Sequence, residues 1–338
     1  MVFTKEKNMI DKKVIIFATG GTIAMKYDEA SGGLVPACTG EDLAAAVPGV
    51  GDVAPLEFFQ FSNIASPAMT PDNMWAMHLK IEEFLRRDDV AGVVVTHGTD
   101  TLEETSYFLD ITKESDKPIV TTAAMRGAGD TSPDGPMNIY CAVKTAASPA
   151  AVGMGVLVCL NETLHAPGEV MKTHSANPAT FASPWWGPVG YVDLDRVIIR
   201  RAPLGVRRYH PKALTAKVDL IKAMTGSDRD YVDFAVSRGV QGIVIEGFGR
   251  GNLPPPMVAG IEDAVKKGVA VVLTTRTPGG RVLDVYGYPG SVTDSRRAGI
   301  AMAGEISAAK ARLKLMVLLS EHPEMARDRA RLEAELDI

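Results

Sequence analysis

The sequence predicts an α/β protein with two domains: a larger N-terminal domain whose mainly parallel sheet carries helices on both faces, and a smaller C-terminal α/β, Rossmann-like domain. Apolar runs rich in Val and Ile alternate with amphipathic stretches of helical length. Such strand–turn–helix units imply right-handed crossovers and a parallel sheet. At 338 residues the chain is long enough for two domains. We expect an N-terminal domain over 1–203, a linker over 204–228 and a C-terminal domain over 229–338.

The elements of the N-terminal domain are expected where continuous apolar runs occur, because such runs are typical of strands buried on both faces. The strands are expected at Lys13–Phe17, Leu56–Phe61, Gly92–Val95, Pro118–Thr122 and Gly155–Leu160. The helices are expected at Glu41–Val47, Thr70–Arg87, Thr101–Leu109 and Met137–Ala147. Between positions 161 and 201 the periodicity weakens, which favours hairpins and loops.

The C-terminal domain repeats the alternation on a smaller scale. A glycine-rich turn, Gly247–Leu253, follows the expected strand Val240–Glu246. A further strand is expected at Val269–Thr274. The helices are expected at Asp230–Arg238, Pro254–Lys267, Arg296–Leu319 and Pro323–Leu336.

The turn Thr96–Asp100 joins a buried strand to the helix that begins near Thr101. It places two threonine hydroxyls and a carboxylate at the C-terminal edge of a parallel strand, where ligands bind in open α/β sheets. A structural role is also open, because Asp100 with Glu103, or Thr101 with Glu104, fits a capping box that satisfies amides at a helix start.

A second turn of this kind lies near the N-terminus, where the first strand runs into Gly20, Gly21 and Thr22. Paired glycines let the backbone turn sharply and approach a ligand closely. The spacing matches neither the dinucleotide fingerprint nor the phosphate loop. The polar, glycine-rich segment Met25–Pro36 follows and fits a loop beside a pocket, with a plain surface connection as the alternative.

Composition and charge narrow the function classes. The net charge of −5 gives no reason to expect nucleic acid or an acidic membrane surface as a partner. No apolar stretch approaches the ~20 residues of a membrane span. The charged first residues lack the apolar segment of a signal peptide, so we expect a cytoplasmic protein. Cys38, Cys141 and Cys159 fit reduced thiols, and the six histidines lack metal-ligand spacing, so we expect no metal site.

Two strand ends therefore deliver threonine hydroxyls, Thr22 and Thr99, with Asp100 beside the second. The absence of a Gly-x-Ser-x-Gly elbow argues against an α/β-hydrolase. A hydroxyl is a poor nucleophile until a base removes its proton, and a lysine acts as that base only when it is neutral. The pattern predicts acyl transfer through a hydroxyl. Lys172 is, on sequence alone, more typical of a solvated lysine than of a catalytic one.

The segments Thr19–Ala24 and Thr96–Thr101 together resemble the two signature motifs of the bacterial-type L-asparaginase (asparaginase/glutaminase) family. The resemblance spans nearly the whole chain, with its motifs in the family's order. Further matching segments are Ala123–Arg126, Asp134–Asn138, Lys172–Thr173 and Gly249–Leu253.

The resemblance implies catalytic roles. Thr22 would attack the side-chain amide of asparagine, release ammonia and form an acyl-enzyme that water hydrolyses to aspartate. Lys172 would assist Thr99, and Asp100 would orient both and pair with the substrate's α-ammonium group. Backbone amides near Thr22 and Thr99 would stabilise the oxyanion.

The resemblance also implies the substrate contacts. Ser66 would hold the α-carboxylate, with Pro67 beside it, and Ala124 would receive the amide nitrogen. Asn252 would reach the site of a neighbouring subunit, because the family is usually a homotetramer built from close dimers whose sites lie between domains of two subunits. The partner is thus a small amino-acid amide, and no cofactor is implied. The other expected contacts are Gly21, Gly98 and Met125.

Three departures from the family pattern concern recognition. Gly33 stands where many members place a tyrosine, and Tyr27 is the candidate substitute. Pro67 stands where many members have a glutamine, which removes a side-chain donor and a backbone N–H. The segment Arg276–Val282 is shorter than in dual-specificity members.

We expect asparagine to be preferred over glutamine. The alternatives are a glutaminase or dual enzyme, the ammonia-generating subunit of a tRNA-dependent amidotransferase, and a non-catalytic amino-acid sensor.

Overall fold

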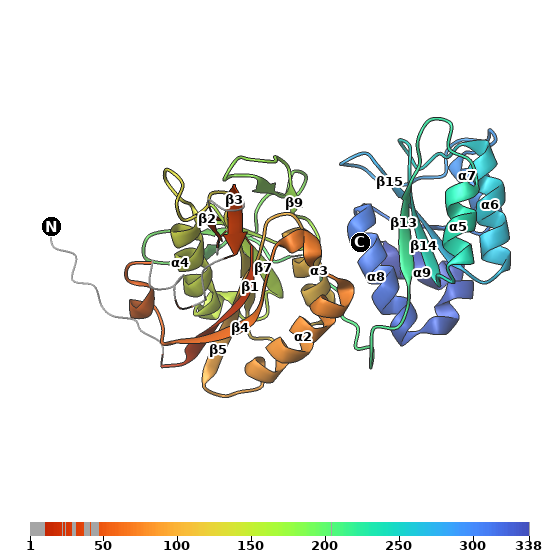
Figure 1. Cartoon of the computed structure of the whole chain (residues 1–338). Helices are drawn as coiled ribbons and strands as arrows, with labels where there is room; N and C mark the ends of the chain where they lie inside the picture. Colours follow the sequence, from red (N-terminus) through yellow and green to blue (C-terminus); the bar gives the residue numbers. More distant parts are fainter. Residues whose placement is uncertain are drawn as a thin grey trace. The chain divides into compact units, whose positions relative to one another are not determined.

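The computed structural model describes residues 11–21, 23, 25–28, 32–36, 41, 47–203 and 205–337 (Figure 1). The chain divides into two compact units, Met1–Arg208 and Tyr209–Ile338. Each unit is a sheet with helices on both faces, which is the expected α/β architecture. Within the described ranges, no helix is both long and apolar enough to cross a membrane.

The first unit is built on an eight-stranded sheet with the strand order β12-β11-β8-β7-β6-β5-β1-β4. Strands β4, β1, β5, β6 and β7 are parallel, and β8, β11 and β12 extend the sheet in antiparallel fashion. These last strands are the hairpins that the weak periodicity after position 161 predicts. The bounds are β1 (Lys13–Gly20), β4 (Leu56–Ile64), β5 (Val90–Thr96), β6 (Ile119–Thr122), β7 (Val156–Leu160), β8 (Thr163–His165), β11 (Gly190–Val192) and β12 (Val197–Ile199).

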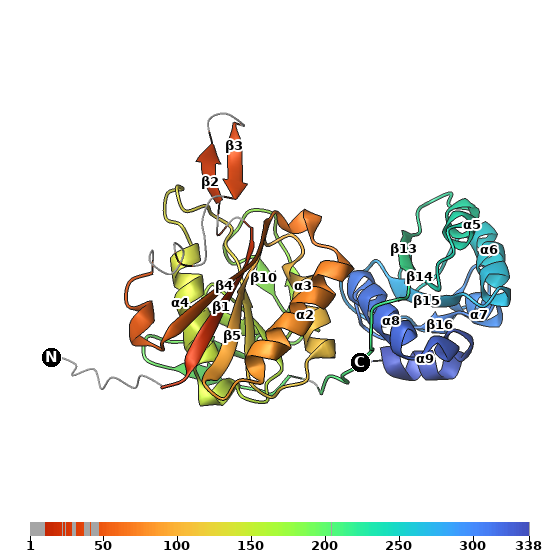
Figure 2. The ribbon, with the colours of Figure 1, turned by 60° about the horizontal axis from the view of Figure 1, so that its bottom comes forward.

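In the part of the first unit that is described, two short hairpins lie outside this sheet. The backbones of β2 (Met25–Asp28) and β3 (Gly33–Pro36) pair in antiparallel fashion and extend away from the main sheet (Figure 2). Strands β9 (Met171–Lys172) and β10 (Phe181–Ala182) form the other hairpin. The segment around Tyr27 is therefore a strand rather than an irregular loop.

Among the described residues, three helices cover the sheet of the first unit, with α4 on one face and α2 and α3 on the other (Figure 1). The hydroxyl of Thr70 accepts from the Asn73 amide at 3.1 Å, which confirms the predicted helix start. The expected helix over 41–47 falls mostly outside the described residues. The bounds are α2 (Pro71–Leu85), α3 (Leu102–Thr112), α4 (Gly135–Ala146) and the short 3₁₀ turns η2 (Val50–Asp52), η3 (Ser66–Ala68) and η4 (Pro149–Ala151).

Strand β1 shows why both faces must be covered. Successive side chains of a strand point to opposite faces, so Val14 and Ile16 pack in the core under α4, while Ile15 and Phe17 pack in the core under α2 and α3. All four are essentially inaccessible to solvent. A continuous apolar run is therefore required here, because neither face of the strand meets water.

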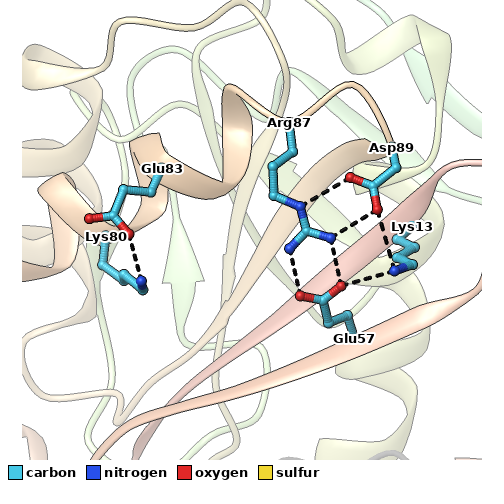
Figure 3. A network of polar contacts seen from close by, with 6 residues as sticks. All are labelled: Lys13, Glu57, Lys80, Glu83, Arg87 and Asp89. Atoms are coloured by element: carbon cyan, nitrogen blue, oxygen red, sulfur yellow. Dashed lines mark hydrogen bonds and ion pairs between the residues drawn. The ribbon is translucent and has the colours of Figure 1, made fainter.

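A network of ion pairs ties the N-terminal ends of the central strands together (Figure 3). Arg87 binds Glu57 through two parallel contacts of 2.6 and 2.8 Å and also binds Asp89 at 2.9 Å. Lys13 lies 3.2 Å from Glu57 and 3.3 Å from Asp89. The Arg87 guanidinium, aided by Lys13, lowers the pKa of Glu57 to about 2. The network lies at the opposite end of the sheet from the turn at Gly98, so its role is structural.

The second unit holds a four-stranded parallel sheet with the order β13-β14-β15-β16. Strand β13 lies inside the range predicted as a linker, so this unit begins before position 229. As an edge strand it buries only Val218 fully, and Asp219 and Lys222 interrupt the apolar run that a central strand would have. The bounds are β13 (Val218–Lys222), β14 (Gly242–Gly247), β15 (Ala270–Thr275) and β16 (Ala301–Met302).

The helices of the second unit differ from the prediction at one place. The single helix expected over Arg296–Leu319 is wrong, because a turn at 298–299 and strand β16 interrupt it. Gly299 has a φ of +96°, which favours glycine and ends α7. The bounds are α5 (Asp230–Ser237), α6 (Pro255–Lys266), α7 (Val292–Arg297), α8 (Ala308–Glu321), η5 (Pro323–Arg327) and α9 (Arg329–Leu336).

Candidate active site

The two predicted turns meet at the carboxyl ends of neighbouring parallel strands. Ala18 of β1 pairs with Thr96 of β5, so the chain leaves both strands at the same edge. A Cβ placed on Gly21 would lie 2.4 Å from the Gly98 nitrogen and Cα. The two backbones touch here, and only glycine permits this approach. The sequence immediately after each strand is thus brought to one place.

Buried hydrogen bonds hold the second turn in its conformation. Thr19 donates to the Thr96 carbonyl at 2.8 Å. His97 is fully buried, and its Nδ1 lies 2.8 Å from the Gly98 carbonyl oxygen while its Nε2 lies 3.1 Å from the Thr105 hydroxyl. Because a carbonyl only accepts, Nδ1 carries the proton and Nε2 accepts from Thr105. Burial lowers the pKa of His97 to about 4, so the ring is neutral and structural.

Thr99, Asp100 and Lys172 form a hydrogen-bonded group at this edge. The Nζ of Lys172 lies 2.9 Å from Thr99 Oγ1 and 2.7 Å from Asp100 Oδ1. The Thr99 residue is only 7 % exposed and the Lys172 side chain 18 %, while the Asp100 side chain is 59 % exposed. A shielded hydroxyl therefore contacts an amine directly, and the carboxylate faces outward, where it can meet a charged ligand group.

The local structure around Lys172 explains how a lysine 72 residues away from Asp100 reaches it. Lys172 ends the two-residue strand β9, where it pairs with Phe181 of β10. Its backbone N–H donates to Glu103 Oε2 at 3.0 Å, in the first turn of α3. Glu103 thus anchors strand β9 to the helix that follows the Thr99 turn. The sequence predicted only a capping role for Glu103.

Ser66 joins a third segment to this edge. Its hydroxyl accepts from the Asp100 amide at 3.2 Å, and its carbonyl accepts from the Thr101 hydroxyl at 2.9 Å. Thr101 occupies the cap position of α3, but its side chain makes no capping hydrogen bond. The Thr101 capping box allowed by the sequence does not form. The buried Ser66 begins η3, and the adjacent Pro67 is exposed.

The loop after β6 forms a further wall. Asp134 accepts from the amides of Met125 at 3.1 Å and Arg126 at 2.9 Å. Asn138 Nδ2 donates to the Ala123 carbonyl at 2.9 Å. Ala124, between these fixed points, is buried. The motif around Asp134 therefore supports the loop through backbone contacts.

Two predicted catalytic positions cannot be placed by their side chains. Thr22 lies outside the described residues, although the preceding Gly21 is described and touches Gly98. Tyr27 is described only through its backbone in β2, where it pairs with Leu34. Within the described part of the chain, no group of three or more His, Cys, Asp or Glu side chains is arranged to hold a metal ion.

Comparison with known proteins covers both units. Residues 13–204 match the family model "Asparaginase, N-terminal", and residues 217–331 match "Glutaminase/Asparaginase C-terminal domain". The chain is 36 % identical to an L-asparaginase of Bacillus licheniformis over 95 % of this chain and 99 % of the relative. It is also 36 % identical to L-asparaginase 2 of Escherichia coli over 91 % of this chain and 89 % of the relative. The chain belongs to the asparaginase family.

Asn252 of this asparaginase-family protein lies in the second unit, in the glycine-rich turn after β14. Its Oδ1 is buried and has no hydrogen-bond partner among the described residues. The backbone of the turn is fixed, since Asn252 N donates to the Phe248 carbonyl at 2.9 Å and Phe248 N donates to the Asn252 carbonyl at 2.9 Å. Buried polar atoms in proteins are mostly hydrogen-bonded, so this amide oxygen requires an explanation.

Proposed function

We propose that this protein hydrolyses the side-chain amide of L-asparagine to L-aspartate and ammonia through an acyl-enzyme on Thr22. The observation that supports this most directly is the contact of Lys172 with both Thr99 and Asp100 at the edge where the Gly21 and Gly98 turns meet. The names of the relatives, several of which are L-asparaginases, support the same substrate.

The chemistry requires an activated hydroxyl and a stabilised oxyanion. The Thr22 oxygen would bond to the amide carbon, the C–N bond would break, and the threonine proton would leave with the nitrogen as ammonia. Water would then attack the ester carbon and restore the Thr22 hydroxyl. Lys172 would assist Thr99, which would relay a proton during these steps. Backbone amides at the turns would stabilise the negative oxygen.

The same edge offers groups that match the two ends of an amino acid. The exposed Asp100 carboxylate would pair with the α-ammonium group, and the Ser66 hydroxyl would bind the α-carboxylate. Ala124, held by the loop after β6, would lie against the amide nitrogen. Gly21, Gly98 and Met125 would complete the contacts through backbone or apolar atoms. The hydrogen bond from the Asp100 backbone amide to the Ser66 hydroxyl supports a site that is preorganised.

An assay of ammonia release from asparagine and glutamine tests this function. Thr22→Ala and Thr99→Ala should each lower kcat about a thousandfold or more, and Lys172→Met about a hundredfold or more, without loss of thermal stability. The exposed positions Thr215 and Lys212 supply matched controls, Thr215→Ala and Lys212→Met, which should keep full activity. Equal rates on both amides would overturn the preference for asparagine. Ammonia from neither amide would contradict the enzyme and favour the sensor.

We also propose a homotetramer of close dimers in which Asn252 completes the site of a neighbouring subunit. The buried, unpartnered Asn252 Oδ1 supports this assembly. Mixing inactive Thr99→Ala and Asn252→Ala proteins, after dissociation and reassembly, should restore activity, because hybrid oligomers contain sites with both residues intact. Light scattering measures the mass of the assembly. A monomer, or no recovery on mixing, contradicts the shared site.

We propose that the protein works in the cytoplasm. The buried free thiols of Cys141 and Cys159 support a reducing compartment. The alternative location is the periplasm, because one relative, from Haemophilus influenzae, is named a probable periplasmic L-asparaginase. Fractionation of cells that express the native gene decides the location, and recovery with periplasmic markers would contradict the proposal.

A further inference from the structure

The second unit contains a cavity of about 290 Å³ at the amino-terminal edge of its parallel sheet. The cavity lies where α6 ends and β15 begins, under the 3₁₀ turn η5 and the helix α9. Asn252 and its glycine-rich turn follow β14 at the carboxyl edge of the same sheet. The cavity and the turn that carries Asn252 are therefore at opposite ends of these strands.

The floor of the cavity is apolar. Val265, Val269, Val271 and Leu332 line it, and the last three are buried. Branched aliphatic side chains of this kind offer no hydrogen bond, so they favour an aliphatic ligand body over a sugar or a nucleobase. The volume lies just below the lower end of the roughly 300–1,000 Å³ that small-molecule pockets span. A ligand of the size of a short-chain organic acid fits.

The rim of the cavity is cationic. Lys266 and Arg329 have other contacts, since Lys266 pairs with Glu262 at 2.7 Å and Arg329 donates to the Arg296 carbonyl at 3.0 Å. The Arg327 side chain makes no hydrogen bond or ion pair within the part of the chain that the structure describes.

The environment of Arg327 keeps its charge available. Its guanidinium lies against Gly268, where an added Cβ would be 3.1 Å from Nη2. The neighbouring acid Asp328 caps α9 by accepting from the Arg331 amide at 3.0 Å. Glu324 pairs with Arg331 at 3.2 Å. The nearby carboxylates thus have partners of their own, and a planar donor with two parallel N–H groups is left at the mouth of an apolar cavity.

We propose that this cavity binds a small aliphatic carboxylate, with its carboxylate on the Arg327 guanidinium and its chain over the Val271 and Leu332 floor. The planar guanidinium matches a carboxylate through two parallel hydrogen bonds. The apolar floor selects against ions that have no hydrocarbon body. This site makes the second unit a small-molecule binding module in addition to any role of Asn252.

Calorimetric titration of the full chain with hexanoate tests the proposal, with hexan-1-ol and inorganic phosphate as comparison probes. We expect saturable binding of hexanoate and weaker binding of the other two, because the alcohol lacks the charge and phosphate lacks the chain. Arg327→Gln should weaken hexanoate about tenfold. Arg196→Gln, which removes an exposed arginine of the first unit that does not line the cavity, should leave the affinity unchanged. Ala326→Leu should fill the cavity and weaken hexanoate without removing a charge.

Three results would overturn the proposal. These are the absence of saturable binding at the solubility limit, an affinity that is the same in Arg327→Gln, and phosphate binding as tight as that of hexanoate. Thermal unfolding of each variant verifies that it is folded. Because every readout is binding, the outcome is independent of amide hydrolysis.

Discussion

Substituting Gly98 by alanine tests whether the close approach of the two turns controls the site. The added Cβ would lie 2.7 Å from Ser66 Oγ and 2.8 Å from Ser66 Cβ, whereas ordinary contact begins at 3.4 Å. To restore ordinary contact, Ser66 or the turn has to move by about 0.7 Å, which is the distance from 2.7 to 3.4 Å. Misplacing a positioning group by ~1 Å can cost about a hundredfold in rate. We therefore expect Gly98→Ala to lower kcat/KM for asparagine between about ten- and a hundredfold, with a stability loss of about 1–3 kcal/mol.

The assay follows kcat and KM for asparagine together with urea unfolding. Displacement of Ser66 should raise KM, because that hydroxyl is the proposed contact of the α-carboxylate. Gly51→Ala is the matched control, since Gly51 lies in η2 and an added Cβ there meets nothing within 4 Å. A Gly98→Ala enzyme with kcat/KM close to that of the unaltered protein, or an equal loss in Gly51→Ala, would refute the reasoning.

Two further predictions concern stability and pH. Glu57→Gln should lower the free energy of unfolding at neutral pH by about 1 kcal/mol, after discounting for solvent screening. Arg87 lowers the folded-state pKa of Glu57 to about 2. The stability difference between Glu57→Gln and the unaltered protein should therefore be complete above about pH 4.5 and fade as the pH falls toward 2. Urea unfolding across this range measures the difference, and a value that does not change with pH contradicts the prediction. Because burial lowers the pKa of His97 to about 4, unfolded chains bind more protons between pH 6.5 and 4, and stability should fall there by up to about 1.4 kcal/mol per pH unit. His97→Gln should be less stable at pH 7 but show a shallower decline than the unaltered protein, and equal slopes in the two proteins would count against a neutral buried His97.

The glycine turns and the threonine-rich turn were predictable because they are local signals. A buried strand followed by small and polar residues indicates a ligand edge whatever the rest of the chain does. The hydroxyls after β5 could therefore be named from sequence. Lys172 was different, because only the family resemblance separated it from an ordinary solvated lysine. Its approach to Thr99 depends on the β9–β10 hairpin and on Glu103, neither of which has a local signature.

Two segments of the second unit differ from their predicted structure for a common physical reason. The linker prediction missed β13, because an edge strand needs only one apolar face and so lacks a continuous run. The single helix expected over Arg296–Leu319 is broken at Gly299. The positive φ of this glycine ends α7 before strand β16 begins. In both places a short element gains its stability from the neighbouring strand rather than from its own composition.

The sequence by itself determined the alternation of strands and helices, the two glycine turns and the hydroxyl groups that follow the strands. These features depend on side-chain periodicity and backbone sterics, which act over a few residues. Only the tertiary structure decided that Gly21 and Gly98 touch and that the Ser66 hydroxyl accepts from the Asp100 amide. It also decided that the Thr101 hydroxyl donates to the Ser66 carbonyl instead of capping its own helix. Those contacts depend on the register of β1 against β5 and β4. Register is set by packing across the whole sheet, because distant strands must bury their apolar faces together.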